Sequence, residues 1–202
     1  MKLPKILLLI LSALIAGCDD DDNAALQGGG PGYATPTPAS DVVAAGNGFC
    51  GPQGGSVALG SPSFNSGVTT AKLDLDGNPA GEGVDPDWNS QTTGSVNGQP
   101  VNSAQYNYVV MSRAQMQQSG VGIGDWATVT NTTTGQSTFA RVEDVGPQNG
   151  IGEISQATAT AVGIQQVVVQ TKEGPSTVPV GDPTVDVEAY AGSSGIEGNC
   201  QT

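Results

Sequence analysis

The sequence contains no histidine and little basic or aromatic character. Without imidazole there is no Ser-His-Asp triad, no Cys-His pair and no histidine metal ligand, so acid–base chemistry must rest on carboxylates, Lys, Tyr or Cys. Six Lys and Arg face 19 Asp and Glu, a formal net charge of −13 over 202 residues. Nucleic acid is therefore not expected as a partner, because neutralising phosphates requires clustered basic residues. Cationic or neutral partners fit this composition better.

The N-terminal residues 1–17 predict an export signal. Lys2 and Lys5 accompany an apolar run from Ile6 to Ala16, which is well short of the about 20 residues needed to span a membrane. The end of the run, Leu14-Ile15-Ala16-Gly17-Cys18, resembles the bacterial lipobox. This resemblance implies that Cys18 is acylated and becomes the mature N-terminus. The alternative is an ordinary signal with an accidental cysteine.

Residues 18–45 predict a tether between this anchor and a folded domain. Asp19 to Asp22 come first, and a stretch rich in Gly, Pro, Thr and Ala follows. Such a stretch cannot bury enough apolar area to offset its ordering entropy, so we expect it to be flexible. The aspartates either retain the lipoprotein at the inner membrane, by resemblance to some Gram-negative lipoproteins, or form a solvated spacer. We therefore expect an exported bacterial lipoprotein, facing the periplasm or the cell exterior, that contacts the membrane only through its lipid and is a monomer.

Two further cysteines suggest a disulfide bond. Exported proteins meet oxidising conditions, and Cys50 and Cys200 lie near the two ends of the region that should fold. A bond between them would join the termini of the domain. Two free thiols are the alternative.

Residues 46–202 predict a mainly β domain. Short runs rich in β-branched residues are separated by Gly and Pro, and we expect strands at 68–76, 106–111, 125–131, 137–144, 167–171 and 184–188. Two stretches, 112–119 and 155–162, predict short helices that begin at Ser112 and Ser155. Many short strands with few helices favour a small β-barrel or a sandwich.

Several blocks within residues 68–165 resemble a known family. They are Lys72-Leu-Asp-Leu-Asp-Gly77, Asp85-Pro-Asp-Trp-Asn-Ser-Gln-Thr92, Tyr108-Val-Val110, and Asp144-Val-Gly-Pro147 followed by Ile151-Gly-Glu-Ile-Ser155. In this order they resemble glycoside hydrolase family 75, the fungal-type chitosanases, within the double-psi β-barrel group. The resemblance implies a small double-psi-like barrel and the hydrolysis of β-1,4-linked glucosamine chains. One departure is Glu143, which stands where the family pattern has Gly.

The resemblance places an inverting catalytic pair on Asp144 and Glu153. Glycosidases need one carboxyl group to protonate the leaving oxygen and a second to activate water, and they need no histidine. The Gly- and Pro-rich loop between the two residues allows the chain to reverse, so that both could face one groove. We assign Glu153 as the acid and Asp144 as the base. On these residues alone, Asp144 could equally form a turn and Glu153 could cap the helix that begins at Ser155.

Other residues are expected to support substrate binding. Asp74, Asp76 and Asp85 would bind the ammonium groups of glucosamine units, unless they are simply exposed turn residues. Their spacing imitates a calcium loop, but Pro79 occupies the position that requires Gly, so we predict neither metal nor cofactor. Trp126 is expected in the core, whereas Trp88 could stack on a sugar. Lys72 would pair with a carboxylate or tune the catalytic pair, and Ser155 would support the site.

Three functions follow from these observations. The first is a lipid-anchored chitosanase-like endo-hydrolase acting on chitosan or a related polysaccharide. The second is a peptidoglycan lytic enzyme resembling the rare-lipoprotein-A proteins, which would need only one acid. The third is a barrel that binds cell-wall glycan without catalysis, in the manner of expansins.

Overall fold

The computed structural model describes residues 50–53, 58–147 and 150–200, which belong to one compact unit of the chain. The predicted signal, Cys18 and the tether lie outside these residues. Within them no helix is long and apolar enough to cross a membrane. The elements are β1 (Gly51–Pro52), β2 (Phe64–Asn65), β3 (Thr69–Thr70), β4 (Lys72–Asp74), η3 (Pro79–Gly81), β5 (Ser95–Val96), β6 (Gln99–Pro100), β7 (Tyr108–Ser112), α1 (Arg113–Ser119), β8 (Trp126–Asn131), β9 (Ser137–Gly146), β10 (Glu153–Ser155), α2 (Gln156–Ala161), β11 (Gln166–Gln170), β12 (Pro175–Pro179), β13 (Thr184–Tyr190) and β14 (Gly198–Asn199).

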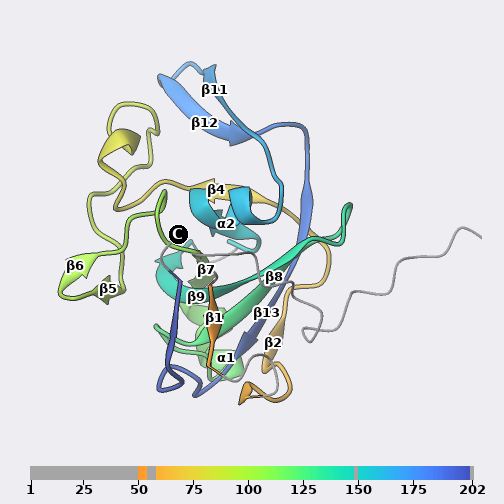
Figure 1. Cartoon of the computed structure of the whole chain (residues 1–202). Helices are drawn as coiled ribbons and strands as arrows, with labels where there is room; N and C mark the ends of the chain where they lie inside the picture. The colour runs from red at the N-terminus through yellow and green to blue at the C-terminus, as the bar shows by residue number, and fades with distance from the viewer. Residues whose placement is uncertain (1–49, 54–57, 148–149, 201–202) are drawn as a thin grey trace, which may run out of the picture. The chain divides into compact units, whose positions relative to one another are not determined.

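The fold is mainly β, as predicted, and is built on one eight-stranded sheet (Figure 1). Its strand order is β2-β13-β8-β9-β7-β10-β4, with β3 also paired to β13. The pairs β7–β9 and β4–β10 are parallel, and the remaining pairs are antiparallel. The strands predicted at 125–131 and 137–144 are β8 and β9, which pair with each other in antiparallel orientation. Two small hairpins, β5–β6 and β11–β12, lie outside this sheet.

The segment 69–74 links the two sides of the sheet. Its first part, β3, pairs with β13, and its second part, β4, pairs with β10. Between them the amide of Ala71 donates to the carbonyl of Pro183 at 2.8 Å. The single strand expected at 68–76 is therefore two short strands that pair with different partners. No continuous ladder closes the described sheet, so the double-psi form of the barrel stays a prediction.

The core has two main parts. The larger part consists of small and branched side chains from the sheet and α2, including Val109, Val142 and Ile154, all at most 1% exposed. The second part surrounds the fully buried Trp126, which confirms its prediction as a core residue. The Trp126 ring meets Phe139 edge-on, with a centroid separation of 6.3 Å. Branched side chains dominate because they fill the narrow space over a pleated sheet without large aromatic rings.

The predicted disulfide bond is present. Cys50 and Cys200 are bonded, with their Cα atoms 4.0 Å apart. Both are buried against Trp126. The bond lies beside the β1–β14 pair, so the two ends of the described chain are joined by both a covalent bond and a short ladder.

Both helices begin where the sequence predicts. The Ser112 hydroxyl accepts from the amide of Gln115, whose side chain accepts from the Ser112 amide, a complete capping box. Ser155 caps α2 by accepting from the amide of Thr158 at 3.1 Å. Because β10 runs directly into α2, this cap also fixes the position of Glu153 at the start of β10.

Candidate active site

Five carboxylates that the sequence singled out line one pocket. The pocket has a volume of about 420 Å³ and is lined by Leu73, Asp74, Asp76, Asp85, Asp87, Val110, Asp144, Val145, Gly146, Pro147 and Glu153. Two larger hollows, of about 750 and 900 Å³, lie elsewhere on the surface, but one is lined by a single carboxylate, Glu197, and the other by no ionisable group. The smaller pocket is therefore the one whose lining can perform acid–base chemistry. We call it the acidic pocket.

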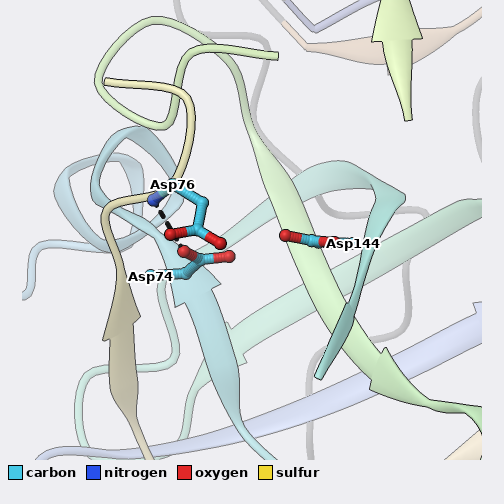
Figure 2. A group of neighbouring side chains, drawn as sticks. All are labelled: Asp74, Asp76 and Asp144. Atoms are coloured by element: carbon cyan, nitrogen blue, oxygen red, sulfur yellow. Dashed lines mark hydrogen bonds between the residues drawn. The ribbon is translucent and has the colours of Figure 1, made fainter. Parts of the chain in front are cut away.

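Asp74 and Asp76 come from the end of β4. The Asp76 amide donates to Asp74 Oδ1 at 2.8 Å, and Figure 2 shows the two carboxylates side by side. Asp74 is only 7% exposed. Burial, helped by the negative charges of Asp76, Glu153 and Asp144, raises the pKa of Asp74 to about 7, against the effect of its backbone hydrogen bond. Burial also raises the pKa of Asp76 to about 6, although the amide of Asn89 donates to it at 2.7 Å.

Asp144 reaches the acidic pocket from β9 and points towards this pair (Figure 2). Carboxylate oxygens of Asp74, Asp76 and Asp144 lie within 4.8 Å of one another. Asp144 is 7% exposed. Its Oδ1 accepts from the Thr93 amide at 3.0 Å, from the Thr93 hydroxyl at 2.7 Å and from the Val145 amide at 2.7 Å. Asp144 is thus held in one orientation by donors on a single oxygen.

Glu153 enters the acidic pocket from β10, on the other side of β7 from β9. Burial raises the pKa of Glu153, and the negative charges of Asp76, Asp144 and Asp85 add to this, whereas Lys72 lowers it. Lys72 lies directly opposite Glu153 in the β4–β10 register. The expectation that Lys72 acts on the catalytic pair therefore has a geometric basis. Glu153 also lies near Gly146, where an added Cβ would come within 3.1 Å of its Oε2.

The loop after β4 supplies the outer wall of the acidic pocket. Asp85 and Asp87 line it, and the Asp87 amide donates to Asp85 Oδ1 at 3.1 Å. Trp88 is half-buried in the same loop but does not line the pocket, since its Nε1 donates to the carbonyl of Asn78 at 2.8 Å. A stacking role for Trp88 stays a prediction that this position does not support. Asn78 caps η3 and donates to Gln156, so its side chain is engaged within the protein.

Three residues of this site were missed by sequence reasoning. Asp87 lies two positions after Asp85 in the sequence block Asp85–Thr92, and its place in that block could have suggested a role in the site. Thr93 carries no sequence signal, because its contact spans 51 positions. Glu143 was noticed only as a departure from the family pattern; it is 5% exposed, and burial raises its pKa to about 7, with Arg141 opposing and Asp144 adding to the effect.

Ser155 supports the site from behind. It is fully buried, donates to the carbonyl of Tyr106 at 2.8 Å and accepts from the amide of Tyr108 at 3.2 Å. It therefore ties β10 and α2 to β7. Lys72 and Ser155 thus both act near the predicted catalytic pair without lining the acidic pocket.

The carboxylate oxygens of Asp74, Asp76 and Asp144 could bind a hard cation, because such ions prefer carboxylate ligands. The same set also suits the ammonium group of an amino sugar, which is a cation that donates hydrogen bonds.

No family model and no curated protein matches this chain. The resemblance to glycoside hydrolase family 75 therefore rests on the sequence blocks alone. What the structure contributes independently is the gathering of their carboxylates in the acidic pocket.

Proposed function

We propose that this protein is an exported glycoside hydrolase that cleaves β-1,4-linked glucosamine chains with inversion. One observation carries the proposal: the acidic pocket gathers Asp144 and Glu153, from strands β9 and β10, together with Asp74, Asp76 and Asp85. Hydrolysis of a glycosidic bond needs two carboxyl groups that differ in protonation and share one groove. The acidic pocket is open enough to admit part of a sugar chain and is rich in such groups.

The environments of the two carboxyl groups favour different roles. Asp144 accepts three hydrogen bonds on Oδ1, which fixes its orientation, and within the described part of the chain they leave Oδ2 for a water molecule. Burial and negative neighbours raise the pKa of Glu153, which suits an acid. Glu153 would give its proton to the glycosidic oxygen as the C1–O bond breaks. Asp144 would take a proton from the water whose oxygen bonds to C1.

The charge of the acidic pocket indicates the substrate. Glucosamine units carry ammonium groups, whereas N-acetylated units are neutral, so a lining with five aspartates and one glutamate favours the former. Binding an ammonium group beside Asp74 and Asp76 would also favour loss of their protons, because a nearby cation stabilises the charged carboxylate. Chitosan should be preferred over chitin, and the preference should weaken as added salt screens these charges.

Product analysis of the mature protein with partly acetylated chitosan and with peptidoglycan tests the proposal. Wild type should release reducing ends from chitosan, and Glu153→Gln and Asp144→Asn should each lower kcat by about 100-fold or more while still binding the polymer. Glu82→Gln and Asp182→Asn are matched controls, because both residues are exposed and neither lines the acidic pocket. Their rates should equal that of wild type.

Each alternative function has its own outcome in this experiment. Release from peptidoglycan but not chitosan would support the lytic enzyme. Binding of glycan with no release by wild type would support the non-catalytic barrel. If wild type and Glu153→Gln release reducing ends at equal rates, Glu153 is not the general acid.

A further inference from the structure

Strand β9 contains a bulge immediately before Asp144. In the parallel β7–β9 pair, Val109 is opposite Val142 but Val110 is opposite Asp144, so Glu143 has no partner on β7. Side chains of a regular strand alternate, which would place Val142 and Asp144 on the same face. Val142 and Val109 lie in the apolar core, whereas Asp144 and Val110 line the acidic pocket. The bulge therefore moves Asp144 from the core face to the pocket face.

The segment Thr92–Gly94 lies against this bulge. The Gly94 amide donates to the carbonyl of Glu143 at 2.7 Å. The Thr92 hydroxyl donates to the carbonyl of Gly94 at 2.9 Å and accepts from the amide of Val101 at 2.8 Å. Gly94 has no space for a side chain, since a Cβ would lie 3.0 Å from the Glu143 carbonyl oxygen and overlap the Glu143 carboxylate. The segment is thus held on both sides of Thr93.

Thr93 is the residue of this segment that touches Asp144. Its amide and its hydroxyl both donate to Asp144 Oδ1, at 3.0 and 2.7 Å. Two donors from one residue, together with the Val145 amide on the same oxygen, oppose rotation of the carboxylate. Among the residues that the structure describes, these donors all contact Oδ1 and leave Oδ2 of Asp144 to a ligand in the acidic pocket.

We propose that Thr93 is a positioning residue that aims Oδ2 of Asp144 at the attacking water. The inference rests on the proposed function, because it concerns the same reaction. Thr93 does not itself exchange a proton with substrate. It acts by restricting the base to one rotamer, and a reacting group misplaced by about 1 Å costs about 100-fold in rate.

Three variants test the role of Thr93. Thr93→Val keeps the shape and the backbone donor but removes the hydroxyl donor, so kcat on chitosan should fall about 10- to 100-fold with KM within about twofold of wild type. Thr93→Ser retains the hydroxyl and should recover kcat to within about threefold. Thr134→Val is the matched control, because Thr134 lies in the β8–β9 turn and does not line the acidic pocket. Its kcat should be unchanged.

The outcomes separate this inference from the proposed function. If wild type hydrolyses chitosan but Thr93→Val has the same kcat, the positioning role is wrong and the proposed function stands. If Thr93→Val and Thr93→Ser lose kcat equally, the effect is not that of the hydroxyl donor and the inference is also wrong. If wild type hydrolyses nothing, both fail. Urea denaturation should show that both variants are fully folded under the assay conditions; a loss of activity explained by unfolded Thr93→Val protein would contradict positioning.

Discussion

Asp74 is a buried carboxylate surrounded by other carboxylates. Burial raises its pKa from 3.8 to about 7, and the negative charges of Asp76, Glu153 and Asp144 add to this, although the Asp76 amide donates to it. Between pH 3.8 and about 7, the Asp74 carboxyl group is therefore mostly protonated in the native state and mostly ionised in the unfolded chain. Across that interval the free energy of unfolding should fall as the pH rises, because the unfolded state releases the proton earlier. The acidic pocket is thus assembled at a cost in stability above neutral pH.

Replacing Asp74 with Asn should remove this cost. The amide has no charge to desolvate and its oxygen can still accept from the Asp76 amide. Asp74→Asn should be more stable than wild type at pH 8 by roughly 2–4 kcal/mol and nearly equal to it at pH 4. Urea denaturation at pH 4, 6 and 8 measures this, with Asp182→Asn, an exposed aspartate, as control. If the free energies of unfolding of Asp74→Asn and wild type change in the same way with pH, ionisation of Asp74 carries no cost in stability and the prediction is wrong.

At the scale of elements, Gly94 and the β9 bulge depend on each other. Gly94→Ala would push a methyl group into the Glu143 carboxylate and against its carbonyl oxygen. Overpacking of this kind costs about 1–3 kcal/mol, and relief would require the Thr92–Gly94 segment to move away from Asp144. The midpoint of urea denaturation should therefore fall. Gly195→Ala is the control, since Gly195 has open space at its Cβ position and no positive φ; equal midpoints for both variants would contradict close packing at Gly94.

These elements also show which parts of the fold could be predicted from the sequence. Strands and helix starts could be predicted because their signals are local: β-branched runs favour β8, β9 and β13, and Ser112 and Ser155 each cap the helix that follows. The face on which Asp144 lies could not be predicted. Regular alternation from Val142 would place Asp144 in the core. The bulge at Glu143 reverses that assignment, and it arises from pairing with the distant strand β7, where Val109 is opposite Val142 but Val110 is opposite Asp144.

At the scale of the whole molecule, the acidic pocket needs segments that are distant in sequence. Its carboxylates come from β4, the loop at 76–87, β9 and β10. The sequence blocks predicted that Asp144 and Glu153 would share a groove, and the structure brings them to the same pocket. It could not be predicted that Trp88 would turn into its own loop, because a tryptophan among polar residues gives no indication of which neighbour its indole will reach.

The disulfide bond closes this assembly over a separation of 150 residues. In the chain-entropy account, a loop of that length restricts the unfolded ensemble by about 5 kcal/mol. The double variant Cys50→Ser/Cys200→Ser should therefore lose about 3–5 kcal/mol of unfolding free energy. It should also show a larger m-value in urea, because its unfolded chain exposes more surface.

Reduction supplies the control for this prediction. A thiol reductant should lower the stability of wild type to about that of the double variant and leave the variant unchanged. Because Cys50 and Cys200 also pack against Trp126, tryptophan fluorescence reports the same region. If the reductant alters neither protein, or lowers both equally, the bond does not stabilise the fold. A loss confined to wild type would show that the disulfide bond itself stabilises the mainly β domain, as expected of a protein that folds in an oxidising compartment.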